Sequence, residues 1–561
     1  MESQRSILII GLLLVSFLLW TEYQEAYGPK VVQPVAQETE SGPTNLGIPS
    51  AQPSALPSTN ESNLGGLVPE EDDKPLTTLP SSTNENRYIT VNTDSFFIKI
   101  DLIGGDVVQA DLVKYPLTQG SNDSYPLLKP DDALIHVAQS GLIGKDGTDT
   151  NAGRAQYSAT SSTYTLTDNT LVVPLTWQSN DGVSVTKTFT FTKDSHLIDV
   201  DYSVTNNKSE VAKVRQFAQL LQSTNDVEGG SMFMPTYRGA AFSTKEDRFD
   251  KLSFDDIAND KLKESTMGGW VGMIEHYFVA AWVPPQDQEN TISALMLQNK
   301  YAVIRFTGEQ VNIQPGETAT ISSELYVGPK DQDTLEEIAD GLDLTVDYGV
   351  LWFISKFLFA MLQFLHGFAG NWGLAIILIT LIVKGAMYWL TKKQYESMAK
   401  MRNLAPKMAQ LKDRFGDDRQ KMSQAMMELY KKEKVNPMGG CFPLILQMPI
   451  FLALYWVLLE SVELRHADFI FWITDLSVKD PYFVLPILTG LSMYFLQRLQ
   501  PMTIQDPLQQ KLMQFMPVMM TVFFLWFPSG LVLYWLVNNL VTLAQAKMIY
   551  ASMEKRGIKS K

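Results

Sequence analysis

Residues 371–391 read NWGLAIILITLIVKGAMYWLT, and this stretch decides the fold of the C-terminal half of the chain. It is apolar and long enough to cross a bilayer as a helix, because about 20 residues span the hydrocarbon core. Lys384 nevertheless lies inside the apolar run. Thr380 and Tyr388 stand four residues before and after it, so a helix places all three side chains on one face. The stretch predicts a membrane span with a charged face.

Lys384 has two interpretations. A charged group at mid-helix costs roughly 2.5 to 3.5 kcal/mol on insertion scales, and such groups usually face protein or water. The lysine could instead snorkel toward the nearer membrane surface. Thr391, where the apolar run ends, is seven residues away, which corresponds to roughly 10 Å of helix rise. A lysine stem spans that distance poorly, so we favour a hydrated cavity lined by protein.

Composition limits the possible functions. The chain has 561 residues and a net charge of −15, with acidic residues dominating 22–347 and basic residues dominating the polar segments after Thr391. In a membrane chain this asymmetry signals orientation, so we expect no sequence-specific binding of nucleic acid. Cys441 is the only cysteine, and the five histidines lack ligand spacing. We therefore expect no metal site and no cofactor.

The N-terminal 86 residues predict an anchor and a tether. An apolar run over about residues 6–20 follows Arg5, and no small-x-small cleavage site comes after it. We interpret residues 1–27 as an uncleaved signal anchor with its N-terminus in the cytoplasm. Residues 28–86 are rich in Pro, Ser, Thr, Asn and Gly, and their composition predicts a flexible periplasmic tether.

Residues 87–345 predict a large periplasmic antiparallel β-sandwich. Many runs alternate β-branched or aromatic residues with polar ones between turn signals, VSVTKTFTFT (183–192) and HLIDVDYSV (196–204) among them. Carbohydrate-active proteins often use such sandwiches, but the sequence here does not identify a pair of carboxylates that could act as the catalytic residues of a glycoside hydrolase. A folding scaffold or docking surface is the favoured interpretation.

Residues 346–370 predict an amphipathic helix that lies in the membrane interface. Apolar side chains recur there at steps of three and four: Leu351, Ile354, Leu358, Met361, Leu365 and Phe368. A span at this position would carry the basic segment after Thr391 to the outside, against the positive-inside rule. We therefore assign the next segment, 371–391, as the second span.

Residues 392–436 predict a basic cytoplasmic hairpin of two helices. Met398, Met401 and Met408 lie on one helical stripe, Met422 and Met426 on another, and 416–418 form the turn. Methionine stripes adapt to varied partners, and they could equally hold the two arms together. Both interpretations stay open.

The rest of the chain predicts four more spans and a tail. The third to sixth spans are expected at 437–460, 481–499, 512–527 and 531–548, with a basic cytoplasmic tail at 549–561. The expected fold is a multi-pass bundle of six spans, five of them forming a core, with both termini cytoplasmic. The first and fifth spans are shorter than the bilayer core is thick, which thins the bilayer locally.

No recognisable catalytic constellation is present, since HExxH, GxSxG and P-loop patterns are missing from the sequence. We therefore do not expect an enzyme and nominate no catalytic residue. A secondary transporter of a small anionic solute is the alternative, but transporters usually show internal repeats with paired broken helices. A membrane site that receives other hydrophobic chains fits better, with polar residues such as Gln447 offering partial hydration.

Three long segments resemble the YidC membrane protein insertases in their Gram-negative form, which are related to mitochondrial and chloroplast insertases. They are NWGLAIILITLIVKGAMYWLTKKQYESMAKMRNLAPK (371–407), KVNPMGGCFPLILQMPIFLALYWVL (434–458) and DPLQQKLMQFMPVMMTVFFLWFPSGLVLYW (506–535). The resemblance implies a bacterial inner-membrane protein with a hydrophilic groove open to the cytoplasm. It implies insertion of nascent inner-membrane proteins, alone or with the Sec translocon and its accessory subunits, beside the ribosome and membrane lipids.

The resemblance also implies site residues. The groove and substrate contacts fall on Thr380, Lys384, Gln447, Met448, Pro449, Phe451, Tyr534 and Trp535. Many members carry Arg in place of Lys384, so bidentate pairing with a carboxylate is lost here while the charge remains. Many also carry Tyr in place of Trp535. Positions that face the ribosome fall on Tyr388, Tyr395 and Asp506.

Overall fold

The structure is a computed structural model that describes residues 87–131, 133–150, 153–225, 236–259, 262–415, 418–433, 442–499 and 507–555. The predicted anchor (1–27) and tether (28–86) lie outside the described residues, as does Asp506. Among the described residues, those between 400 and 433 form one compact unit and all others form a second.

The first sheet has ten strands in the order β14-β17-β18-β11-β5-β3-β2-β1-β7, with β4 beside β3. Their neighbours are antiparallel except β1 and β7, which pair in parallel. The strands are β1 (Tyr88–Asn92), β2 (Phe96–Asp101), β3 (Asp106–Pro116), β4 (Ser124–Leu128), β5 (His136–Ile143), β7 (Thr163–Thr165), β11 (Ala212–Ser223), β14 (Lys263–Met267), β17 (Glu289–Leu297) and β18 (Tyr301–Ile313).

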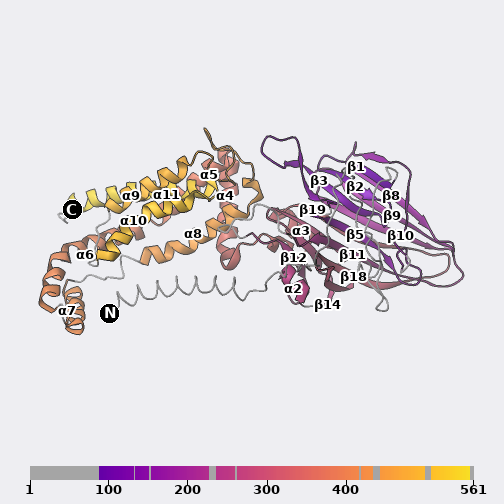
Figure 1. Ribbon diagram of the computed structural model, residues 1–561, viewed down its shortest axis with the longest axis horizontal. Coiled ribbons are helices and arrows are strands. Elements are labelled where there is room, and N and C mark those ends of the chain that lie inside the picture. Colours follow the sequence, from indigo (N-terminus) through magenta and orange to yellow (C-terminus); the bar gives the residue numbers. More distant parts are fainter. Residues whose placement is uncertain are drawn as a thin grey trace, which may run out of the picture. The chain divides into compact units, whose positions relative to one another are not determined.

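The second sheet has nine strands in the order β13-β12-β15-β16-β19-β10-β9-β8-β6, and all neighbours are antiparallel. The strands are β6 (Ser158–Ala159), β8 (Thr170–Gln178), β9 (Val183–Thr192), β10 (Leu197–Asn206), β12 (Gly239–Ser243), β13 (Asp250–Leu252), β15 (Trp270–Ile274), β16 (Phe278–Val283) and β19 (Thr318–Pro329). Both sheets occupy the indigo-to-magenta part of the ribbon (Figure 1).

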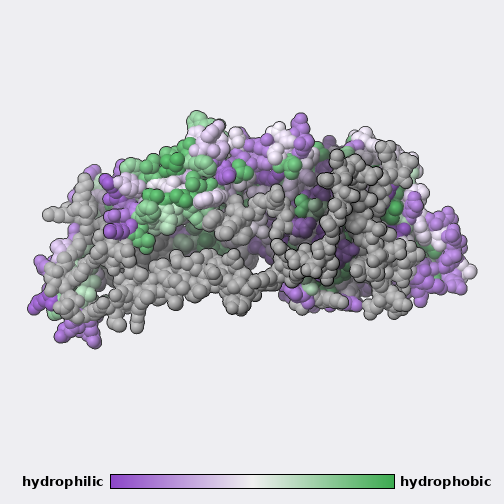
Figure 2. Space-filling model, viewed as in Figure 1, coloured by the Kyte–Doolittle hydropathy of each residue, from purple (hydrophilic) through white to green (hydrophobic). Residues whose placement is uncertain are grey.

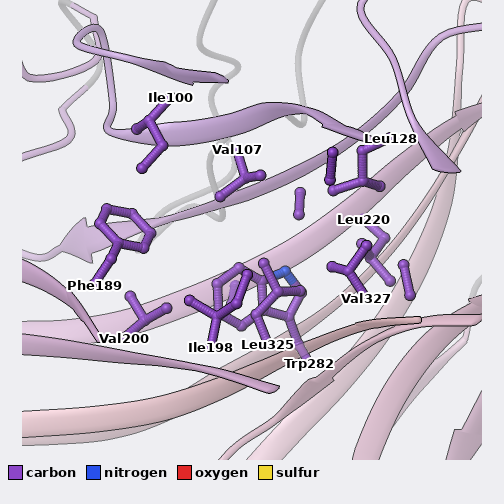
Figure 3. Packing of buried hydrophobic residues seen from close by; sticks show 14 of the residues in the cluster. Ile100, Val107, Leu128, Phe189, Ile198, Val200, Leu220, Trp282, Leu325 and Val327 are labelled. Carbon is purple, nitrogen blue, oxygen red and sulfur yellow. The ribbon is translucent and has the colours of Figure 1, made fainter. Parts of the chain in front are cut away.

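One apolar core lies between the two sheets. Along β9 and β10 every second residue is buried, because successive side chains of a strand point to opposite faces. Phe189, Ile198 and Val200 of the second sheet thereby share a core with Ile100 and Val107 of the first (Figure 3). This packing produces the large antiparallel β-sandwich that the alternating runs predict.

The remaining described elements are mostly helical. They are α2 (Phe254–Asn259), α3 (Gln332–Ile338), η2 (Leu342–Thr345), η3 (Gly349–Leu351), α4 (Trp352–Ala369), α5 (Trp372–Ala386), α6 (Tyr388–Phe415), α7 (Arg419–Lys432), α8 (Phe442–Glu460), η5 (Val462–Leu464), α9 (Val484–Leu499), α10 (Pro507–Phe524) and α11 (Ser529–Lys555). Apolar side chains gather on the surface over α5, α9 and α11, as expected of helices that face lipid (Figure 2).

Only part of the predicted stripe of α4 is buried. Leu358 and Leu365 pack inward, whereas Phe368 at the end of the stripe is 86% exposed. Ser355, which the pattern places away from the stripe, is buried because its hydroxyl donates to the carbonyl of Ala453 in α8 at 3.2 Å. The exposed face instead carries aromatic side chains, including Phe357 and Phe364.

The prediction of one helix over 371–391 is wrong in detail. Asn371 caps α5 by accepting from the backbone N–H of Leu374, but α5 ends at Ala386. The next helix begins at Tyr388 and the two are bent by 61°. Gly385 precedes the break, and a glycine near a helix end favours a bend because it is a poor helix former.

By length and hydropathy, one described helix, Gly349–Ala369, could cross a membrane alone, and the bent pair containing α5 could form a second span. The described residues also include three shorter apolar helices, Gln447–Glu460, Val484–Leu499 and Lys511–Phe524. The longest candidate is the helix that the charge distribution assigns to the interface, so the number of spans stays a prediction.

The described part of the basic hairpin contains α7 and all of α6 except its first four residues. Lys407 pairs with Glu433 at 2.6 Å, and the hydroxyl of Tyr430 donates to the sulfur of Met408 at 3.8 Å. Asp418 caps α7 through the backbone N–H of Lys421. At least one methionine of the first stripe therefore contacts the opposite arm, as expected if the stripes hold the arms together.

The sandwich contacts the end of α8 and the loop that follows it, residues 461–483, through charged groups. Lys330, just after β19, pairs with Glu460 at 2.8 Å, and the two side chains are 2% and 4% exposed. Arg465 donates to the carbonyl of Pro116 at 2.8 Å and lies over the rings of Tyr125 and Phe278. These contacts join the end of α8 to the sandwich.

Glu463 lies at the same contact and gives it a pH dependence. Burial, together with the negative charges of Asp331 and Asp333, raises the pKa of Glu463 to about 7. In an unfolded chain the pKa of glutamate is about 4.3, so between these values the folded state holds a proton that the unfolded state has released. The contribution of Glu463 to stability is therefore lost progressively as the pH rises toward 7.

We expect Glu463→Gln to remove this pH dependence, because the amide is neutral at every pH. The thermal midpoint of the variant minus that of the parent should increase from pH 5 to pH 8. This range covers most of the interval between the unfolded pKa of about 4.3 and the folded pKa of about 7, and one unit beyond it. The measurement is a set of melting curves of both purified proteins across that range. A difference that stays constant with pH would contradict the assignment.

Candidate functional site

A cavity of about 270 Å³ lies among α5, α6, α8, α9, α10 and α11. Its polar lining comes from Lys384, Thr391, Gln394, Tyr395, Gln447, Gln497, Asn538, Asn539 and Thr542. Its apolar lining comes from Met448, Phe451, Met493, Leu496, Met513, Met516, Pro517, Tyr534 and Trp535. The cavity therefore combines hydrogen-bonding groups with adaptable apolar ones.

Lys384 is held by a chain of amides. Its ammonium donates to Oε1 of Gln447 at 3.3 Å, and Nε2 of Gln447 donates to Oδ1 of Asn538 at 3.1 Å. A third amide side chain, that of Gln545, donates to the backbone carbonyl of Lys384 at 3.1 Å. The lysine thus links three helices, α5, α8 and α11, at the cavity.

The ammonium of Lys384 is a buried positive charge. Its residue is only 6% exposed, and within the part of the chain that the structure describes no carboxylate pairs with it. A charge in such a place is costly unless water or an anionic group approaches it. The cavity is therefore suited to attract a carboxylate from an incoming molecule.

Methionines and aromatic rings form the apolar lining. The ring of Phe451 meets that of Trp535 edge-on at 4.6 Å and stacks with that of Tyr534 at 6.2 Å. Methionine side chains are flexible and polarisable, so they can pack against apolar groups of many shapes. This composition suits a variable apolar segment better than one small solute.

Most of the predicted groove residues meet at this cavity. Lys384, Gln447, Met448, Phe451, Tyr534 and Trp535 line it, and so does Tyr395, which was predicted to face the ribosome. Thr380, Pro449 and Tyr388 are absent from the lining of this cavity. Thr380 is buried because its hydroxyl donates to the carbonyl of Ile376 in its own helix at 2.6 Å. Tyr388 begins α6, which is bent by 61° from α5, so the spacing rule that placed it on the face of Lys384 does not apply.

Several polar residues of the site are not among the site residues that the resemblance implies. Asn538, Thr542 and Gln545 recur at steps of four and three along α11, so they share one face of an otherwise apolar helix. That spacing is the signal that could have found them. Asn539 lies beside this face, and its amide donates to the hydroxyl of Ser492 at 3.0 Å, which ties α11 to α9.

The site offers binding rather than bond-making groups. In the described ranges no cluster of three His, Cys, Asp or Glu side chains could hold a metal ion. Its amides, hydroxyls and single ammonium can solvate a polar segment while the methionines and rings contact an apolar one. The arrangement can lower the free energy of a chain that is part polar and part apolar at membrane depth.

Comparison with known proteins gives full-length matches. Residues 88–361 match the family described as the YidC periplasmic domain, and residues 364–556 match the family described as 60Kd inner membrane protein. The chain is 60% identical to the membrane protein insertase YidC of Pseudoalteromonas atlantica and 53% identical to that of Shewanella piezotolerans, each over 100% of both chains. A solved structure described as an active YidC insertase aligns with 84% of this chain and 93% of its own at 18% identity, with a TM-score of 0.36.

Proposed function

This chain belongs to the YidC family of membrane protein insertases, and we propose that the cavity around Lys384 is where it receives its substrates. It is an inner-membrane insertase with a β-rich periplasmic domain and a helical C-terminal region. Family membership decides against the alternative of a secondary transporter for a small anionic solute. We infer further that insertion proceeds without covalent chemistry, so the protein is not an enzyme.

The observation that carries the proposal is the hydrogen-bonded chain Lys384–Gln447–Asn538 inside an otherwise apolar bundle. Polar groups at membrane depth are costly and are kept where they face protein or a water-filled cavity. A substrate segment that must pass the bilayer core meets there a charge and several amides in place of hydrocarbon. Its own polar groups lose less solvation, so the barrier to insertion falls.

We place the cavity on the cytoplasmic side of a bundle with six spans and cytoplasmic termini. The basic segment after Thr391 supports this orientation through the positive-inside rule. The exposed aromatic face of α4, including Phe357 and Phe364, supports a position of that helix in the outer interface. The tether 28–86 then connects the sandwich to the anchor 1–27, which contains the first span.

We propose that the partners are nascent inner-membrane proteins, the Sec translocon with its accessory subunits, the ribosome and membrane lipids. Tyr388 and Tyr395 are the described candidates near the ribosome, and Asp506 is the third candidate by resemblance. The ring of Tyr395 packs edge-on against that of Tyr550 of α11 at 5.4 Å, and this contact fixes the first part of α6 next to the cavity. A segment of α6 that is fixed in this way can hold an emerging chain close to Lys384.

Site-specific cross-linking tests the passage through the cavity. In a background with Cys441→Ser, Met448→Cys should form a disulfide with a cysteine in the apolar segment of a single-span substrate during insertion into vesicles. Met448 lines the cavity and is 46% exposed, so its thiol is accessible to a chain there. Disulfide yield on gels and protease protection of the substrate tail are measured together.

Val518→Cys provides the matched control. Val518 is 52% exposed on α10, the helix that contributes Met513 and Met516, but it is absent from the cavity lining. We expect it to cross-link weakly. Insertion with equal yields at both positions would show that substrates do not select the cavity.

A further inference from the structure

The loop between α8 and α9, residues 461–483, buries two of its carboxylates, whereas Asp468, Thr474 and Lys479 are exposed. The carboxylate of Asp480 is 1% exposed and accepts from Nε1 of Trp472 at 3.0 Å and from the backbone N–H of Leu485 at 2.7 Å. Asp475 is 6% exposed and accepts from the backbone N–H of Ser477 at 2.8 Å. Two buried carboxylates thus act as hubs that organise the loop.

The backbone of the loop is also satisfied by protein. The backbone N–H groups of Ser529 and Gly530, at the start of α11, donate to the carbonyls of Val478 and Leu476 at 2.7 Å and 2.8 Å. The side-chain amide of Asn371, before α5, donates to the carbonyl of Asp468 at 3.1 Å. Irregular backbone can lie at membrane depth only where such partners exist.

Some apolar side chains of the loop, such as Leu464 and Leu476, are buried, whereas others point outward. Phe471 is 86% exposed and Tyr482 is 68% exposed, and Ile470 and Val478 are each nearly half exposed. The loop therefore exposes several large apolar side chains within a short stretch of sequence, which is unusual for a surface that faces only water. Aromatic rings of this kind are enriched where a membrane protein meets the headgroup region.

Two aromatic residues of the loop, Phe471 and Phe483, have an unfavourable backbone conformation. Phe471 has a φ of 57° and Phe483 a φ of 56°, values that bulky side chains rarely adopt. Such strain persists where the surrounding structure determines it, and it marks positions with a functional constraint. The backbone N–H of Phe483 donates to the backbone carbonyl of Asp480 at 3.2 Å, which helps to fix this conformation.

The length of α9 sets the depth of the loop. The helix has 16 residues, which corresponds to roughly 24 Å, whereas the hydrocarbon core is about 30 Å thick. If α9 crosses the membrane, one of its ends lies below the surface of a bilayer of ordinary thickness. Where this is the N-terminal end of α9, the loop that precedes it and ends at Phe483 lies within the leaflet rather than above it.

We propose that residues 470–483 form a lipid-binding surface that is inserted into the outer leaflet, with Phe471 and Tyr482 among the glycerol and upper acyl groups of phospholipids. This inference rests on the proposed topology, in which the loop is on the periplasmic side. It adds a lipid contact to the outer end of α8 and α9, opposite the cytoplasmic cavity. Anchored there, the loop keeps the short spans at a fixed depth.

Fluorescence quenching tests the proposal. Phe471→Cys in the Cys441→Ser background is labelled with a small fluorophore, and the full chain is reconstituted in vesicles of phosphatidylethanolamine and phosphatidylglycerol. We expect loss of fluorescence with lipids that carry a spin label high on the acyl chain, less with a label deep on the chain, and little with iodide in the water. Val478→Cys repeats the test at a position without a strained backbone.

Val172→Cys is the matched control, because Val172 is 54% exposed on β8 of the sandwich. It should respond to iodide and not to spin-labelled lipid. The same pattern at positions 471 and 478 would overturn the proposal and would indicate an aqueous surface that takes a protein partner. Substrate insertion is measured in the same vesicles, so quenching as expected without insertion would count against the proposed function alone.

Discussion

Lys384→Ala should reduce the insertion of a single-span substrate with an acidic translocated tail far more than that of the same substrate with a neutral tail. At about 4 Å and an effective dielectric constant of 20, the attraction between the ammonium and a carboxylate is roughly 4 kcal/mol before desolvation. Desolvation must consume much of this, because a site that held the tail tightly could not release it. A net loss of about 1.4 kcal/mol would slow the acidic substrate about tenfold.

A set of variants separates charge from hydration at Lys384. Lys384→Arg keeps the charge and adds donors, so insertion should be equal or better. Lys384→Gln keeps a donor for Oε1 of Gln447 without the charge, and Lys384→Glu should be worst for the acidic tail. Protease protection of both substrates in vesicles is the measurement. Equal defects for both tails in the alanine variant would mean that Lys384 supplies hydration rather than attraction.

Glu460→Ala should destabilise the protein strongly, because it leaves the ammonium of Lys330 buried without a partner. The pair is 2.8 Å apart and almost fully buried. Removing one member of a buried ion pair costs about 3 to 5 kcal/mol, whereas replacing both by apolar residues is often neutral or stabilising. The double variant Lys330→Met with Glu460→Met should therefore recover most of the lost thermal stability.

The surface pair Lys145–Glu210 is the matched control for this experiment. Its side chains are 67% and 73% exposed, so Glu210→Ala should change stability by no more than about 1 kcal/mol. Melting curves of the purified variants in one detergent make the comparison. A large loss for the double methionine variant would show that the charges themselves, and not the filled space, hold the sandwich to the end of α8.

Periodicity and charge determined much of this protein without the structure. The alternation in VSVTKTFTFT and HLIDVDYSV predicted strands β9 and β10, because a strand buries every second side chain. The long apolar runs with Lys384 and Gln447 predicted a membrane bundle with a polar site, since charge at membrane depth is costly. Those two residues do meet, at 3.3 Å.

The tertiary structure alone decided other features. Strands β5 and β11 carry glutamines at buried positions, which the alternation rule does not predict. The amide of Gln219 donates to Gln139 at 2.9 Å and that of Gln216 to Ser323 at 2.8 Å, so each amide N–H₂ group finds an acceptor on a strand distant in sequence. Lys187 points inward by the alternation of β9 and is held by backbone carbonyls, of Gly105 among others.

Contacts between residues that lie far apart in the sequence also explain what sequence reasoning missed elsewhere. Lys330 and Glu460 are 130 residues apart, and nothing in either segment names the other as its partner. Gln447 and Asn538 likewise meet only when α8 and α11 pack, because they are 91 residues apart in the sequence. Local pattern determines which face of an element is apolar, whereas the free energy of burying a polar group depends on the partner that the fold brings to it.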